Sequence, residues 1–191
     1  VTIGDVVYTG TAYAVSEISD AFARYATIIM QGATYGYIGA LGGGQTLIAD
    51  DVSGSGFGGD FVLCNASGVA DLSASTFSGN TGSYVIYADG GTTSMKKSVF
   101  SGNTTDDGVA IYVSRGTATI TGSTFTGNVS ENGGAVIISN GTAAITESTF
   151  SANTSFGTES AASGGGALRV SGGELLVSDT LFCNNFAAED A

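Results

Sequence analysis

The sequence of 191 residues contains no proline, no histidine and no tryptophan, and only 5 Lys and Arg residues stand against 17 Asp and Glu. Without histidine there is no Ser-His-Asp or Cys-His catalytic pair and no histidine-ligated zinc. The net charge of −12 argues against nucleic acid as a partner, because that binding depends on Lys and Arg that neutralise phosphates. No run of 18 apolar residues is present, so we expect no membrane insertion.

The missing proline is informative because average composition would give roughly ten prolines in a chain of this length. Glycine is abundant instead, with 31 residues. Glycine-rich chains with few charges are often disordered, but 42% hydrophobic residues and a mean hydropathy of +0.27 indicate a buried core. We therefore expect a folded chain whose backbone has little room for proline.

A six-residue motif of the form Ser-Thr-Phe-Ser-Gly-Asn recurs five times. Successive phenylalanines are 23, 25, 25 and 32 residues apart, and a step of 25 back from the first reaches Val52, which we interpret as a degenerate sixth copy. The phenylalanines are Phe77, Phe100, Phe125, Phe150 and Phe182. The asparagines are Asn80, Asn103, Asn128, Asn153 and Asn185.

Aligning the copies on this motif predicts further columns. Nine positions before the phenylalanine stand Gly43, Gly68, Gly91, Gly116, Gly141 and Gly173. Five positions before it stand Leu47, Leu72, Met95, Ile120, Ile145 and Val177. Fourteen positions before it stand Ile38, Leu63, Ile86, Ile111, Val136 and Leu168. We expect the glycines at turns that need a positive φ or a close backbone approach.

Between these columns apolar and polar residues alternate with a period of two, which indicates short strands. One such unit cannot bury its apolar side alone, but units stacked in register can, with their strands about 4.8 Å apart. Because almost every backbone N–H is then a ladder donor, proline is excluded. The sequence predicts an all-β parallel β-helix (β-solenoid) of six to seven coils over residues 35–191. Residues 1–34 are expected to form an N-terminal cap or an irregular first coil, with a short helix over residues 16–26 as one possibility.

Two signatures of this repeat, Phe-x-x-Asn and Gly-Gly-Ala followed by an aliphatic residue, resemble the repeats of the polymorphic outer membrane protein family of autotransporter adhesins. The second signature occurs at residues 133–136 and 165–168 and is degraded at residues 108–111. The resemblance implies a right-handed parallel β-helix exposed at a cell surface, and adhesion as its role.

The outward column thirteen positions before the phenylalanine reads Gly39, Cys64, Tyr87, Tyr112, Ile137 and Arg169. Its Tyr87, Tyr112 and Ile137 are more apolar than a solvated sheet face requires, so they are the candidate lateral interface. At the C-terminal end no capping element follows the last repeat, and we expect other copies of the chain to pack there head to tail.

Cys64 and Cys183 stand in different columns of coils that should be about 19 Å apart, whereas a disulfide tolerates Cα separations of about 7 Å. We therefore expect no bridge between them within one chain and treat both as candidates for an intermolecular disulfide. Candidate glycosylation sites in Asn-x-Ser/Thr sequons are Asn103, Asn128, Asn140 and Asn153. Asn140, beside a turn glycine, is the favoured one.

No convergent catalytic cluster accompanies the acidic pairs at residues 50–51 and 106–107, so we predict a protein that is not an enzyme and has no cofactor or metal. The predicted function is an extracellular structural or adhesive β-solenoid, a subunit or segment of a surface fibre. Its partners would be other copies of itself and cell-surface or carbohydrate ligands. The alternatives are a carbohydrate-binding or carbohydrate-active module and, from the threonine column Thr92, Thr117 and Thr142, an ice-binding protein.

Overall fold

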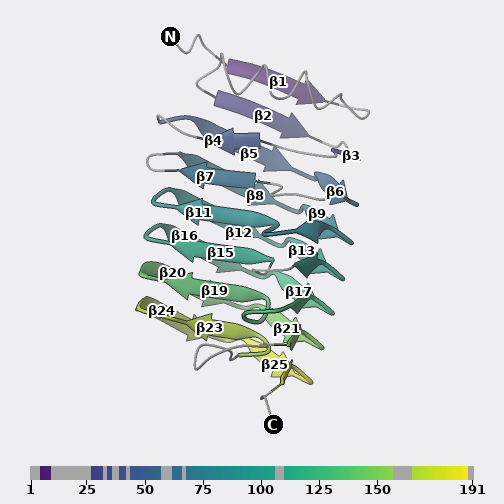
Figure 1. The fold of residues 1–191 in the computed structure, drawn as a ribbon. Helices are drawn as coiled ribbons and strands as arrows, with labels where there is room; N and C mark the ends of the chain where they lie inside the picture. The colour runs from purple at the N-terminus through teal and green to yellow at the C-terminus, as the bar shows by residue number, and fades with distance from the viewer. Residues whose placement is uncertain are drawn as a thin grey trace.

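The computed structural model describes residues 5–9, 27–31, 34–35, 39–41, 44–56, 62–65, 68–105, 110–156 and 165–188. These residues form parallel strands that pair between successive turns of the chain and none of them lies in a helix. Figure 1 shows the turns stacked in chain order from the N-terminus to the C-terminus. The fold is therefore the predicted right-handed parallel β-helix.

Four parallel sheets form the sides of the stack, and we number them I to IV in the order in which each coil visits them. Sheet I contains β1 (Asp5–Thr9), β2 (Thr27–Gln31), β5 (Thr46–Asp50), β8 (Val69–Ser73), β12 (Thr92–Lys96), β16 (Thr117–Thr121), β20 (Gly141–Thr146) and β24 (Gly173–Ser178). Sheet II contains β3 (Thr34–Tyr35), β6 (Ser53–Ser55), β9 (Thr76–Ser78), β13 (Val99–Ser101), β17 (Thr124–Thr126), β21 (Thr149–Ser151) and β25 (Leu181–Cys183).

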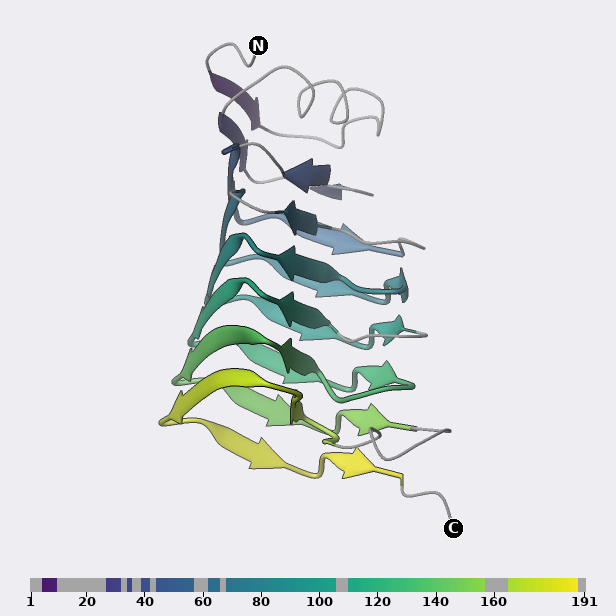
Figure 2. The same ribbon diagram turned by 60° about the vertical axis from the view of Figure 1, so that its left-hand side comes forward.

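The two remaining sheets complete each coil. Sheet III contains β10 (Thr81–Gly82), β14 (Thr104–Thr105), β18 (Val129–Ser130), β22 (Thr154–Ser155) and β26 (Phe186–Ala187). Sheet IV contains β4 (Gly39–Leu41), β7 (Val62–Asn65), β11 (Ile86–Asp89), β15 (Ile111–Ser114), β19 (Val136–Ser139) and β23 (Leu168–Val170). Seen from the side, equivalent strands of successive coils lie above one another (Figure 2).

Four coils contain a strand in every sheet: β8–β11, β12–β15, β16–β19 and β20–β23. Shorter sets of described strands continue the stack at both ends, so within the described residues the number of complete coils is below the predicted six to seven. At the N-terminal end, β1 and β2 pair in parallel and extend sheet I. The helix expected over residues 16–26 lies outside the described residues, and no described segment forms a helix long and apolar enough to cross a membrane.

From residue 69 onward, the register follows the columns that the repeat predicts. Phe100 pairs with Phe77 and with Phe125, and the tyrosine and aliphatic columns continue in the same way. The rings of the five phenylalanines stack along the axis with neighbouring centroids 4.6 to 5.1 Å apart. All are buried except Phe182, which is 43% exposed in the last coil. This aromatic stack forms part of the buried core, together with the aliphatic columns of sheets I and IV.

The predicted register is wrong in the coil before residue 69. Gly54, and not Val52, pairs with Phe77, because this coil is two residues shorter than the assumed step of 25. In the same coil Ala49, and not Leu47, pairs with Leu72. Thr46 pairs with Val69, so Gln45, and not Gly43, is level with Gly68 in the glycine column. Gly43 and Ile38 themselves lie outside the described residues.

In that coil the predicted register of sheet IV is also wrong, by one residue. Val62 pairs with Ile86, so Leu63 and not Cys64 pairs with Tyr87. Gly39 pairs with Val62 and therefore does not share a column with Cys64. Assigning Cys64 and Gly39 to the tyrosine column was wrong. Four positions separate Asn65 from Val69, whereas three separate their partners Asp89 and Thr92, so the turn after β7 is one residue longer than the turn after β11.

The glycine column is required by close approach between backbones. A Cβ added at Gly116 would lie 2.7 Å from the carbonyl oxygen of Gly91 in the preceding coil, and one added at Gly141 would lie 2.9 Å from the carbonyl oxygen of Gly116. Neither of these two glycines has a positive φ. Close packing of successive turns, and not φ, explains why side chains are excluded there.

The asparagine column forms a continuous amide ladder inside the stack. The backbone N–H and Nδ2 of Asn103 both donate to Oδ1 of Asn128 in the next coil, at 3.2 and 2.8 Å. Nδ2 of Asn103 also donates to the carbonyl oxygen of Phe77 in the preceding coil, at 3.1 Å. The same bonds link Asn80, Asn103, Asn128, Asn153 and Asn185. The amides therefore provide acceptors for the buried N–H groups of the asparagines at the turn between sheets II and III.

A second ladder, which the repeat analysis did not predict, runs through the first residue of the motif. The N–H of Ser98 donates to Oγ of Ser123 at 3.2 Å, and that hydroxyl donates to the carbonyl oxygen of Thr121 at 3.2 Å. Equivalent bonds join Ser75, Ser98, Ser123, Ser148 and Thr180. The serine at the turn between sheets I and II is thus a buried structural residue.

We predict that Asn128→Ala lowers the free energy of unfolding by about 4 kcal/mol, because it leaves several buried donors and acceptors without partners. Urea denaturation followed by far-ultraviolet circular dichroism measures the change. Thr117→Ala, on the exposed face of β16, is the matched control and should change stability by about 0.5 kcal/mol or less. Equal losses in the two variants would contradict a structural amide ladder.

Thr93 gives a prediction of opposite sign. Its hydroxyl is buried without a hydrogen-bond partner, and its neighbours in the register are Ala70 and Ala118. We expect Thr93→Val to raise the free energy of unfolding by about 1 kcal/mol, because the change keeps the volume and removes an unsatisfied polar group. Thr119→Val, on the exposed face of the adjacent strand, should have little effect in the same denaturation experiment.

Candidate functional site

The predicted lateral interface lies on the outer face of sheet IV. Tyr87 pairs with Tyr112, and Tyr112 pairs with Ile137, so the three residues form one column across β11, β15 and β19. Both tyrosines are half-buried, but Ile137 is only 3% exposed. A Cβ added at Gly133 would lie 2.8 Å from Cδ1 of Ile137, so the turn before β19 covers this side chain. The prediction of an exposed Ile137 contact is therefore wrong.

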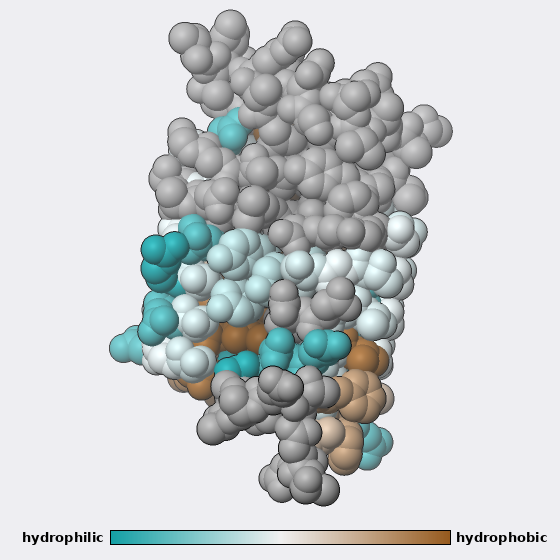
Figure 3. All heavy atoms as spheres, viewed as in Figure 1, coloured by the Kyte–Doolittle hydropathy of each residue, from teal (hydrophilic) through white to brown (hydrophobic). Residues whose placement is uncertain are grey.

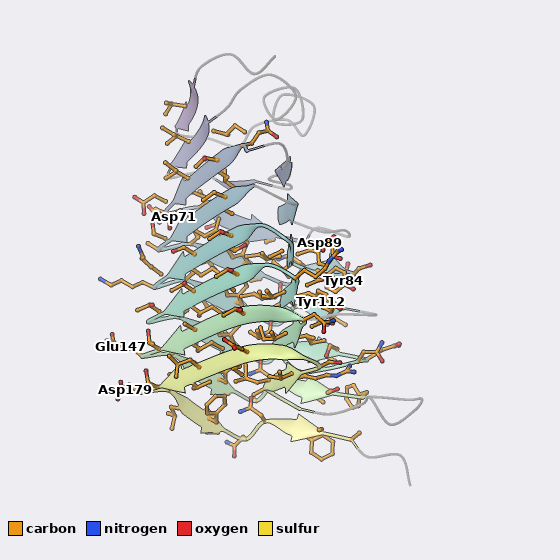
Figure 4. All side chains as sticks on the ribbon, turned by 90° about the vertical axis from the view of Figure 1, so that its left-hand side faces the viewer. Asp71, Tyr84, Asp89, Tyr112, Glu147 and Asp179 are labelled. Atoms are coloured by element: carbon orange, nitrogen blue, oxygen red, sulfur yellow. The ribbon has the colours of Figure 1, made fainter. Side chains whose placement is uncertain are left out.

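A third ring joins the two tyrosines. Tyr84, from the turn before β11, stacks on Tyr87 with ring centroids 4.9 Å apart and planes 16° apart. Its centroid is also 4.9 Å from that of Tyr112, and the Tyr87 and Tyr112 centroids are 5.4 Å apart. Figure 4 shows Tyr84, Tyr112 and Asp89 on one side of the stack, away from Asp71, Glu147 and Asp179. Sequence reasoning missed Tyr84 because it lies in a turn outside every column.

An ion pair lies at the end of β11 beside this aromatic cluster. Nη2 of Arg115 is 2.7 Å from Oδ1 and 2.9 Å from Oδ2 of Asp89, and its Nε donates to Oδ1 at 3.1 Å. The hydrogen bond and charge of Asp89 raise the pKa of Arg115. Burial, followed by the negative charge of Asp89, raises the pKa of Tyr87 above its usual value of 10.0.

A pocket of about 270 Å³ opens next to the tyrosines on the same face. It is lined by Tyr84, Tyr112, Asn132, Ile137, Ser139, Arg169 and Ser171. The guanidinium of Arg169 donates to the carbonyl oxygen of Asn132, which ties β23 to the turn before β19. Figure 3 looks onto this face and shows brown apolar surface between teal polar groups. The outer face of sheet IV is therefore hollowed and chemically mixed, unlike a flat contact surface.

The cysteines lie on different sheets. Cys64 belongs to β7 in sheet IV, and its Cα pairs with that of Ala88. Cys183 belongs to β25 in sheet II and has a free thiol, so it forms no bridge with Cys64 within the chain. Their use in an intermolecular disulfide stays a prediction.

At three of the candidate glycosylation sites, the amide nitrogen that a glycan would modify is part of the amide ladder. Asn103, Asn128 and Asn153 are buried, and Nδ2 of each donates two hydrogen bonds. A glycan on these nitrogens would break the ladder, so their assignment was wrong. Asn140 is exposed at the turn between sheets IV and I, with a φ of 58°, and keeps its place as the candidate.

One residue of the acidic pairs and two threonines of the outward array have side-chain hydrogen bonds in the described structure. Asp50 accepts a hydrogen bond from Oγ of Ser73 at 2.7 Å, whereas residues 106–107 lie outside the described part of the chain. Thr92, Thr117 and Thr142 share one outward column. In a neighbouring column of the same face, Thr146 donates to Thr121 at 3.1 Å. Within the described ranges, no three His, Cys, Asp or Glu residues gather as a metal-binding group.

The environment of Tyr87 predicts a measurable titration. Tyr87 should ionise above pH 10, and Asp89→Asn should lower its pKa while leaving it above the usual value, because burial is the larger cause. A proton bound more tightly in the folded state stabilises the fold below pH 10 and ceases to do so as pH rises through the folded pKa. Nuclear magnetic resonance titration of ¹³Cζ-labelled tyrosine measures both values, and an unchanged pKa in Asp89→Asn would contradict the charge effect.

Comparison with known proteins supports the architecture. The family described as right handed beta helix region matches residues 31–186, which is most of the chain. The searches of curated proteins and of solved structures gave no match. Because the family match and the observed coils cover the same segment, the chain belongs to the right-handed β-helix family.

Proposed function

We propose that this chain is a structural or adhesive β-solenoid of the cell exterior, without enzymatic activity, that associates end to end with other copies of itself. The observation that carries the proposal is an apolar rim on the last described coil, formed by Leu176, Leu181 and Phe186. These side chains are 65%, 59% and 58% exposed. They lie at outward positions of sheets I, II and III in the same coil, and large exposed apolar groups are typical of association surfaces.

The residue types in the rim differ from those of the same columns in earlier coils, so its apolar character does not result only from its position in the last described coil. Leu176 pairs with Ala144, Leu181 pairs with Thr149, and Phe186 pairs with Thr154. In the preceding coils these columns contain mainly small or hydroxyl side chains, including Ser94, Thr119, Thr124 and Thr104. The last coil therefore has large apolar residues at outward positions where strand pairing does not require them.

The last described coil also exposes a core side chain. Phe182 continues the aromatic stack with its ring centroid 5.1 Å from that of Phe150, and it is 43% exposed. A coil of another copy could continue the aromatic and asparagine columns, because each coil presents the same groups as the last. Contacts between unlike ends that do not close a ring produce an open filament.

Two further features support a surface role. The Phe-x-x-Asn and Gly-Gly-Ala signatures resemble those of polymorphic outer membrane protein adhesins, which are exposed at cell surfaces. Cys183 lies beside the rim on β25 with a free thiol, where a second copy could form a disulfide with it. Both features are consistent with a fibre segment outside the cell.

The rim can be tested by restoring the repeat. The triple variant Leu176→Ala, Leu181→Thr and Phe186→Thr inserts the residues of the preceding coil, so it should fold with unchanged circular dichroism. We expect the wild-type chain to form filaments or higher oligomers in electron micrographs and sedimentation velocity. The triple variant should shift to monomer, because it removes the apolar surface that would be buried on association.

Val99→Thr and Val129→Thr provide the control, since they make the same kind of change in the same outward columns at the middle of the stack. These variants should assemble like the wild type. Assembly of the triple variant at the wild-type concentration, or a monomeric wild-type chain, would overturn end-to-end association through this rim.

A further inference from the structure

The pocket on sheet IV is built from four successive coils. Tyr112 comes from β15, Ile137 and Ser139 come from β19, and Arg169 comes from β23. Tyr84 and Asn132 reach it from turns before sheet IV, and Ser171 follows β23. Because rigid strands of neighbouring coils hold these groups, the site is largely preformed. Neither the family match nor the stacking of the coils assigns it a role.

The size of the pocket restricts its ligand. Its volume of about 270 Å³ lies just below the range of about 300–1,000 Å³ that is usual for drug-sized ligands. A single six-membered ring with its substituents fits this space better than a nucleotide or a larger cofactor does. The open side of the pocket permits such a ring to be one unit of a longer chain.

The lining combines an aromatic cluster with neutral hydrogen-bonding groups. Tyr84 and Tyr112 have ring planes 51° apart, so the cluster presents both a ring face and a phenolic edge. Asn132, Ser139 and Ser171 contribute amide and hydroxyl groups that can both donate and accept. A sugar ring has an apolar C–H face that packs on an aromatic ring and a rim of hydroxyls that suits this polar set.

Arg169 is the one charged residue among the residues that line the pocket. A guanidinium has five N–H donors, and the described structure shows a hydrogen bond from one of its nitrogens, Nη1, to the carbonyl oxygen of Asn132. Its remaining donors match the two oxygens of a carboxylate. Asp89, the acid beside the tyrosines, is paired with Arg115, which reduces its repulsion of an anion.

We propose that this pocket binds one carboxylate-bearing sugar residue of a glycan, with the tyrosines against the ring and Arg169 on the carboxylate. The proposal deepens the adhesive role proposed above, since it names the class of surface ligand. The proposal explains why one column of sheet IV contains Tyr87, Tyr112 and Arg169, although the stacking of the coils requires neither tyrosine nor arginine there.

Methyl β-D-glucuronide and methyl β-D-glucoside are suitable probes, because they differ at the carboxylate and share the sugar ring. Titration of the ¹⁵N-labelled full chain, at a concentration below that at which it assembles, should show at least ten-fold tighter binding of the glucuronide, with shifts confined to the pocket residues. Arg169→Met keeps the aliphatic stem and removes the charge, so the two probes should then bind equally. Tyr112→Ala should weaken both probes.

Lys96→Met is the matched control, because it removes an equal charge from an exposed position on β12 of sheet I, outside the pocket, and should preserve the ten-fold preference. Circular dichroism of each variant verifies the fold. Equal binding of the two probes by the wild type, shifts outside the pocket, or a preference that survives Arg169→Met would overturn the proposal. Repeating the titration on the triple rim variant separates the two hypotheses, since loss of filaments should leave sugar binding unchanged.

Discussion

Each coil of this protein obtains hydrogen-bond partners for its buried amides from the coils beside it. The strands exchange N–H and carbonyl groups along the axis, and the asparagine and serine ladders do the same where the chain turns. An unpaired buried amide costs about 1–3 kcal/mol, so a coil that broke the register would lose several such bonds together. This requirement excludes proline, fixes asparagine and serine at turns, and gives every coil nearly the same cross-section.

The same requirement explains which parts of the structure the sequence could predict. The phenylalanine and asparagine columns were recognisable because stacking demands the same residue in every coil. The glycines could be found for a related reason, since a Cβ at Gly116 or Gly141 would collide with the preceding turn. The serine ladder was visible as a recurring Ser but looked like an ordinary turn residue. Its role depends on a hydrogen bond between coils, which no local pattern reveals.

The errors in register have a simple physical origin. Val52 and Gly54 are both buried and two positions apart, so alternation of apolar and polar residues cannot tell which of them occupies the phenylalanine column. Only the pairing of Gly54 with Phe77 decides it. Nor could alternation predict the turns between sheets I and II, where Asp51, Ala74 and Lys97 adopt a positive φ that the sequence does not signal. Turn length and turn conformation are set by the stack and not by local preference.

The stacking of the coils therefore determines the residues of the inward columns. Function can differ between proteins of this architecture at the outward positions, which stacking constrains less. Small or hydroxyl side chains suffice on most outward positions of sheets I and II, because strand pairing there is satisfied by the backbone. Large departures from this pattern occur at the tyrosine cluster on sheet IV and at the rim of the last coil. Tyr84 belongs to no column, yet it completes the aromatic cluster. Residues that the repeat does not explain are thus the ones that point to partners, and they lie on two separate surfaces of one rigid scaffold.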